Sequence, residues 1–187
     1  MQKIGTKTIE TERLILRRFR VEDAAEMYHN WASDPAVTKY LTWKVHANVE
    51  VTAALLSDWV QQYADGGYFN WAIELKETGR VIGNISVVRL NEAADAAEIG
   101  YCMTRALWGR GIMPEALRAV MVYLFDEAQM NRIMAAHDVN NPKSGRVMQK
   151  AGMQFEGVMR QAARNNCGLC DLAVYAALKS DGVPKEP

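Results

Sequence analysis

The chain of 187 residues has an apolar fraction of 49% and a charged fraction of 24%, which is ordinary usage for one globular domain. It carries 22 Lys and Arg residues against 22 Asp and Glu residues, so no excess charge directs it to nucleic acid or to an anionic membrane. It has no apolar run of about 18 residues, and its three cysteines suit a reducing compartment better than a disulfide framework. We therefore expect one cytoplasmic domain over residues 1–187, with a core at about 8–180 and a short flexible C-terminal tail.

Hydrophobic periodicity gives the order of the elements. In order, it predicts a strand at 11–19, helices at 21–28 and 49–63, strands at 68–75, 81–89 and 97–103, a helix from Met113 or Pro114, a strand at 132–138, a helix at 142–151, and strands at 154–162 and 171–178. The strand–helix–strand unit around the third helix requires a parallel crossover, whereas the other strand pairs suit antiparallel pairing. We expect an α/β (α+β) fold: a mixed, mostly antiparallel sheet of about seven strands with helices on both faces.

Residues 108–115, Trp-Gly-Arg-Gly-Ile-Met-Pro-Glu, lead into an amphipathic helix. Gly109 and Gly111 allow positive φ and close approach of a bulky anion, and Pro114 suits the first turn of a helix. The unpaired N–H groups and about half a positive charge at the helix N-terminus favour phosphate there. The turn lacks the Gly-Lys-Ser/Thr ending of a nucleotide-hydrolysing loop and the third glycine of the dinucleotide fingerprint. It predicts a pyrophosphate cradle, with an ordinary turn before a core helix as the alternative.

These elements and motifs resemble the GNAT superfamily of N-acetyltransferases, and within it the ribosomal-protein N-terminal acetyltransferases. The resemblance covers nearly the whole chain, and the order and spacing of its motifs are more specific than any one of them. Its motifs are Thr-Glu-Arg-Leu-Ile-Leu-Arg at 11–17, Glu-Ile-Gly-Tyr at 98–101, the glycine turn at 108–113, and the segment 138–152 with Asn141, Ser144, Val147, Lys150 and Gly152.

The resemblance implies that acetyl-CoA is the co-substrate and that no metal takes part. It implies that main-chain amides from Gly109 to Met113 hold the pyrophosphate beside a splayed parallel strand pair, where the pantetheine arm pairs with the main chain like an extra strand. The implied cofactor-binding residues are Tyr101, Cys102, Met103, Trp108, Gly109, Arg110, Gly111, Ile112, Met113, Asn141 and Ser144. For Arg110, a charge contact with the cofactor and a solvated loop position both stay open.

Acyl transfer needs a neutral amine, because an ammonium group has no lone pair, so a base must accept its proton. Glu98 is the candidate base, and its alternative role is a structural carboxylate bonded to a neighbouring strand or loop. In many GNAT enzymes a tyrosine seven residues after the asparagine protonates the leaving thiolate, and Met148 stands at that position here. Since free thiols have a pKa near 8.5, Ser144 or water can assist the departure of the thiolate. The candidate catalytic residues are therefore Glu98 and Ser144.

The branch resemblance implies a protein N-terminal α-amine as the acceptor. Two alternatives stay open: a small amine such as an antibiotic, polyamine or amino acid, and a sensor module that binds acyl-CoA without turnover. A homodimer is compatible with the sequence. His137 is expected in the core or at a sheet edge rather than in the acceptor cleft, and Cys167 and Cys170 form neither a zinc set nor a thioredoxin-like motif.

Overall fold

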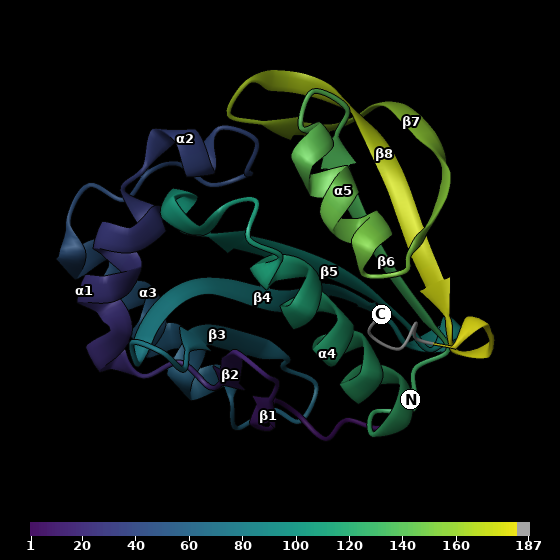
Figure 1. Ribbon diagram of the computed structural model, residues 1–187, viewed down its shortest axis with the longest axis horizontal. Helices are drawn as coiled ribbons and strands as arrows, with labels where there is room; N and C mark the ends of the chain where they lie inside the picture. The colour runs from purple at the N-terminus through teal and green to yellow at the C-terminus, as the bar shows by residue number, and fades with distance from the viewer. Residues whose placement is uncertain (183–187) are drawn as a thin grey trace.

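A single mixed sheet of eight strands organises the computed structural model, which describes residues 1–182 (Figure 1). The strands are β1 (Ile9–Glu10), β2 (Leu14–Arg17), β3 (Asn70–Leu75), β4 (Arg80–Asn91), β5 (Ala96–Met103), β6 (Arg132–Asp138), β7 (Gln154–Asn165) and β8 (Gly168–Leu178). Their order across the sheet is β1-β2-β3-β4-β5-β6-β8-β7. Among these described strands, β5 and β6 pair in parallel and every other pair is antiparallel, which confirms the expected mixed sheet.

Helices cover both faces of the sheet. The helices are α1 (Ala24–Met27), α2 (Pro35–Thr38), α3 (Val49–Gln62), α4 (Ile112–Asp126) and α5 (Pro142–Lys150). Short helical turns lie at Val21–Asp23, Tyr28–Ala32, Glu92–Ala94, Arg105–Leu107 and Lys179–Asp181. In Figure 1, α4 and α5 lie in front of the sheet, and α1 to α3 gather at its left and upper-left edge.

Two buried clusters correspond to the two faces. The larger cluster joins the inner sides of α4 and α5 to β5 and β6, and the smaller one joins α1 and α3 to β3 and β4. The periodicity of α4 predicts its buried face correctly, because Ala116, Leu117, Val120, Met121, Leu124 and Phe125 are all buried. Trp43 and Trp59 pack against the smaller cluster, so both serve helix packing. The residues of β5 contribute to both clusters, which places this strand between two separately packed layers.

The structure differs from the sequence expectation mainly at the ends of elements. Strand β1 was not expected, because two residues are too few to show alternation. The helix expected at 21–28 is a short turn, α1 and a wide helical turn in succession. The final hairpin is longer than expected: β7 and β8 are separated by Asn166 and Cys167 alone. Irregular register in β7 hides its periodicity, since the pairing shifts between Phe155 and Gly157 and again between Met159 and Ala163.

No helix within residues 1–182 is long and apolar enough to cross a membrane. The last five residues of the expected C-terminal tail, 183–187, lie outside the described residues.

Gly83 on β4 provides a test of the sheet, because a Cβ there would lie 2.6 Å from the Cys102 carbonyl oxygen and 2.8 Å from the Met103 Cβ. We predict that Gly83→Ala lowers the free energy of unfolding by about 1–3 kcal/mol, as overpacking against backbone does. Urea unfolding measures the change. Gly100→Ala is the matched control, since its Cβ would meet only the exposed Val88 side chain within 3.0 Å. An equal loss in both variants would contradict the prediction.

Candidate functional site

The site begins where β5 and β6 diverge. Their parallel ladder consists of Ala96, Ala97 and Glu98 opposite Arg132, Ile133 and Met134. Beyond Glu98, β5 stays paired with β4 on its other side and β6 stays paired with β8, so a gap opens between them (Figure 1). The predicted splayed pair is therefore present, and its apex lies at Glu98.

The main chain of β5 has one edge open to this gap. The Thr104 N–H donates to the Ile82 carbonyl of β4 at 2.8 Å. Because hydrogen-bonded and non-bonded positions alternate along an antiparallel pair, the main-chain groups of Cys102 also face β4. Those of Tyr101 and Met103 face the gap, where the Met103 carbonyl accepts a hydrogen bond from the Trp108 indole N–H at 3.1 Å. Of the three residues expected to pair with pantetheine, Tyr101 and Met103 are thus the two whose main chain faces the gap.

The glycine turn lies at the wide end of the gap, after β5. Gly109 and Gly111 have φ values of +81° and +76°, which side chains rarely adopt, and Gly111 is the residue before α4. A Cβ at Gly109 would meet no atom within 4 Å, so its main chain is open to an approaching group. The side chains of Ile112 and Met113 are buried, and their N–H groups at the start of α4 make no main-chain hydrogen bond with another described residue. Such a cradle fits the pyrophosphate of coenzyme A.

The N-terminus of α5 faces this turn across the gap. The Tyr101 hydroxyl lies 3.0 Å from the Ser144 Oγ and donates to the Ser144 carbonyl at 3.1 Å. The Lys143 Nζ lies 5.3 Å from the centre of the Trp108 ring. The structure therefore brings the turn and Ser144 together, as expected, and adds Lys143 as a cation beside the turn. Sequence reasoning assigned Lys143 no role, and its place next to Ser144 was the only signal for one.

Within residues 1–182, the side chains of Asn141 and Arg110 make no hydrogen bond or ion pair with another residue. The Asn141 N–H donates to the Asp138 carbonyl at 2.7 Å, while its side-chain amide makes no hydrogen bond with any described residue. Arg110 is exposed on the glycine turn, where its carbonyl accepts a hydrogen bond from Arg13. Both side chains are therefore available to a ligand in the gap.

His137 fixes the distance between α5 and β6. Its ring stacks on Tyr175, and its Nδ1 lies 2.7 Å from the Asp138 carbonyl oxygen. A Cβ at Gly145 would lie 2.6 Å from the His137 Nε2, so glycine is required where α5 crosses the ring. His137 is thus a buried packing residue, as expected.

The carboxylate of Asp138 ties the start of α5 to the last hairpin. It accepts hydrogen bonds from the Asn140 N–H at 2.8 Å and from the Asn165 side-chain amide at 2.7 Å. Burial alone would raise the pKa of Asp138, but these hydrogen bonds outweigh it and hold the pKa below its ordinary value. Asp138 is therefore a charged anchor between β6 and the end of β7.

Glu98 stands at the apex of the gap with a side chain that is 21% exposed. Its carboxylate lies 3.6 Å from the Arg89 Nε on β4, a long contact to a largely exposed guanidinium group. The contact with Arg89 is consistent with a structural role for Glu98. The partial exposure of the Glu98 side chain beside the gap is consistent with the role of a base. Met148, at the position of the usual general acid, is 1% exposed and belongs to the core under α5.

The end of α2 and the loop after it contact the turn between β7 and β8. The Asn166 side-chain amide donates to the Thr38 carbonyl at 2.8 Å and to the Trp43 carbonyl at 2.7 Å, and its N–H donates to the Leu41 carbonyl at 3.2 Å. We call these contacts the Asn166 bridge. Sequence reasoning missed it, because nothing local marks an asparagine in a hairpin turn as a partner of a loop more than 100 residues away.

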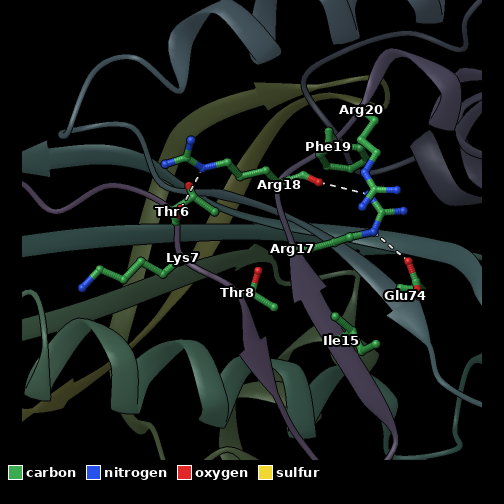
Figure 2. A pocket seen from close by; sticks show the side chains of 9 residues that line it. All are labelled: Thr6, Lys7, Thr8, Ile15, Arg17, Arg18, Phe19, Arg20 and Glu74. Atoms are coloured by element: carbon green, nitrogen blue, oxygen red, sulfur yellow. Dashed lines mark hydrogen bonds and ion pairs between the residues drawn. The ribbon is translucent and has the colours of Figure 1, made fainter.

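Other polar clusters offer no site of comparable quality. An open depression of about 650 Å³ is lined by Thr6, Lys7, Thr8, Ile15, Arg17, Arg18, Phe19, Arg20 and Glu74. Figure 2 shows that Arg17 points to Glu74 and Arg18 to Thr6, at distances of 2.7 and 2.9 Å. No cluster of three or more His, Cys, Asp or Glu side chains suited to a metal ion occurs in residues 1–182.

Comparison with known proteins identifies the family. The model of the family described as "Acetyltransferase (GNAT) domain" matches residues 13–154, which is most of the chain. The chain belongs to the GNAT acetyltransferase family. It is an acetyl-CoA-dependent N-acetyltransferase, as the sequence motifs predict.

Relatives of this GNAT acetyltransferase match over most of its length. The "Uncharacterized N-acetyltransferase p20" of Bacillus licheniformis is 31% identical over 175 residues, which cover 94% of this chain and 98% of that protein. The crystal structure of the GNAT-family acetyltransferase from Bacillus anthracis superposes with a TM-score of 0.81 at 26% identity, covering 93% and 99% of the two chains. The "Ribosomal-protein-serine acetyltransferase" of Escherichia coli (strain K12) is 31% identical over 112 residues, or 60% and 62% of the two chains.

The cysteines of the acetyltransferase differ in reactivity. Burial raises the pKa of the Cys102 thiol to about 12, so roughly one thiol in ten thousand is ionised at about pH 8, whereas Cys167 is exposed in the hairpin turn. We predict that iodoacetamide at this pH modifies Cys167 rapidly and leaves Cys102 unmodified, as peptide mass spectrometry would show. In guanidinium chloride both should react alike. Equal rates in the folded protein would contradict the packing of the partly buried Cys102 against the smaller cluster.

Proposed function

We propose that this acetyltransferase transfers the acetyl group of acetyl-CoA to the N-terminal α-amine of a protein or peptide. The proposal assigns the chain to the branch of ribosomal-protein N-terminal acetyltransferases. The motifs quoted above support it, and so does the similarity to the Escherichia coli protein whose name states acetylation of a ribosomal protein.

Three carboxylates, in α1, just before α2 and at the apex of the gap, are paired with arginine, and their pairing supports the choice of acceptor. Glu26 lies 3.1 Å from Arg80, Asp34 lies 3.1 Å from Arg105, and Glu98 lies 3.6 Å from Arg89. A polyamine or an aminoglycoside presents several cationic amines, and several unpaired carboxylates are needed to complement them. A peptide presents one amine at the end of an extended chain. Carboxylates already paired with arginine therefore favour the peptide acceptor.

We propose that main-chain amides and the dipole of a helix, rather than charged side chains, make most of the contacts with acetyl-CoA. In this proposal the amides from Gly109 to Met113 and the N-terminus of α4 bind the pyrophosphate, with Arg110 and Lys143 as nearby cations. The open main chain of Tyr101 and Met103 pairs with the pantetheine arm, and the Asn141 side-chain amide bonds to it from the opposite side. Acetyl-CoA supplies the activated thioester carbonyl.

Two side chains handle protons. Glu98, at the apex of the gap, accepts the proton of the incoming amine directly or through water, and its half-exposed position permits exchange with solvent. The Ser144 hydroxyl donates a hydrogen bond to the departing sulfur. The Tyr101 hydroxyl donates its single proton to the Ser144 carbonyl, so the serine O–H must rotate away from its contact with the Tyr101 oxygen to reach the sulfur. Buried Met148 has no proton to supply.

The acceptor is tested by incubating the purified protein with acetyl-CoA and a panel of amines, while release of free coenzyme A thiol is followed. We expect turnover with short peptides that carry a free N-terminal Ser or Ala, and none with the same peptides after N-terminal blocking, even when they contain lysine. Spermidine, aminoglycosides and free amino acids complete the panel.

Turnover with these small amines alone would overturn the peptide assignment and keep the chemistry. Binding of coenzyme A without turnover on any amine would instead favour the sensor alternative, to which buried Met148 points.

The proton-transfer roles make a kinetic prediction. Glu98→Gln should lower kcat by about 10²-fold, the usual contribution of a general base. Ser144→Ala should lower kcat with little change in KM for acetyl-CoA. Glu92→Gln is the matched control, because Glu92 is an exposed glutamate paired with Lys3 on a turn before β5. Unchanged kcat in Glu98→Gln would assign Glu98 to the structural role.

A further inference from the structure

A buried carboxylate lies directly under the glycine turn. Glu115 is in the first turn of α4 and is 5% exposed. A negative charge there interacts favourably with the helix dipole, but it has the same sign as the phosphates that the proposed function places at this helix terminus. Unless it is neutralised, this carboxylate should weaken phosphate binding.

Residues of the first hairpin surround this carboxylate. The Thr11 hydroxyl donates to Oε1 at 2.6 Å, and the Arg13 N–H donates to the same oxygen at 3.0 Å. The Arg13 side chain donates to Oε2 from Nε at 2.7 Å, and its Nη2 lies 2.6 Å from that oxygen. Burial alone would raise the pKa of Glu115, but these contacts outweigh it and keep the carboxylate ionised.

The same guanidinium group also reaches the turn. Its Nη1 donates to the Arg110 carbonyl at 3.0 Å, which fixes the residue between the two glycines. A Cβ at Gly111 would lie 3.6 Å from the Arg13 Nη2, so the guanidinium group adjoins the last residue before α4. The Arg13 side chain is 41% exposed, although each of its three nitrogens has a partner. One side chain thus touches both the buried charge and the turn.

We propose that Arg13 is a positioning residue for phosphate binding: it neutralises Glu115 beneath the α4 N-terminus and holds the Arg110 carbonyl so that the turn amides point to the pyrophosphate. This inference rests on the proposed cofactor role of the turn. It assigns a function to the Thr11–Arg13 hairpin turn, which lies outside the residues that contact the cofactor. Glu115 is its obligatory partner, and Thr11 completes the set of hydrogen bonds to the carboxylate.

The test compares binding of coenzyme A with binding of pantetheine, which has the same arm and lacks the pyrophosphate. Isothermal titration calorimetry of Arg13→Gln should show at least about a tenfold loss of affinity for coenzyme A, because an unpaired carboxylate then opposes the phosphates. The affinity for pantetheine should stay unchanged. In Arg13→Gln with Glu115→Gln both groups are neutral, and most of the affinity for coenzyme A should return.

Two further variants keep the test sound if Arg13→Gln folds poorly. Arg13→Lys retains the charge and loses the planar fork, so its affinity for coenzyme A should lie between wild type and Arg13→Gln. Arg132→Gln is the matched control: Arg132 forms the same kind of pair with Glu156, at 2.7 Å, at the opposite end of the parallel strands. Its affinity for coenzyme A should match wild type.

Three results would overturn the role of Arg13: coenzyme A affinity within twofold of wild type in Arg13→Gln, equal losses for coenzyme A and pantetheine, or no recovery in the double variant. A different result separates this inference from the proposed function. If wild type binds coenzyme A no more tightly than pantetheine, the turn does not hold the pyrophosphate, and the cofactor assignment itself fails.

Discussion

The divergence of two parallel strands is the constraint on which the rest of the molecule depends. A ladder of three residue pairs holds β5 and β6 together, and beyond Glu98 each strand has only its outer neighbour. An open strand edge inside a sheet leaves backbone groups unpaired, and such groups are costly when they are buried without a partner. In the acetyltransferase this edge is bordered by the main chain of Tyr101 and Met103, the glycine turn, and the start of α5, which are the groups that the proposed function gives to the cofactor.

The two-layer packing around β5 separates the two halves of the reaction. On one side, α4 and α5 begin at the gap, and in the proposed function their N-termini hold the anionic end of the donor through amides and dipoles. On the other side, α1 to α3 and the last hairpin surround the place where an amine would enter. In the proposed function, Glu98 at the apex between these layers accepts the proton of the acceptor and takes no part in phosphate binding.

Local signals predicted the helices and turns around the gap well, and non-local contacts escaped prediction. The buried face of α4, the left-handed glycines and the α5 start could be predicted, since periodicity, glycine and proline act within a few residues of themselves. That Cys102 directs its main chain to β4 depends on the register with another strand, and one sequence does not carry that register. The same holds for the contacts Tyr101–Ser144 and Arg13–Glu115, whose partners are 43 and 102 residues apart.

The Asn166 bridge joins the last hairpin to the loop after α2 across a long stretch of the chain. Its hydrogen bonds join positions 123 and 128 residues apart, so they carry one of the larger loop-closure costs in the fold. The same hairpin also anchors the start of α5, because Asn165 donates to the Asp138 carboxylate and Tyr175 stacks on the His137 ring. A change in the hairpin therefore reaches both layers at once: the loop after α2 through the bridge, and the N-terminus of α5 through Asp138.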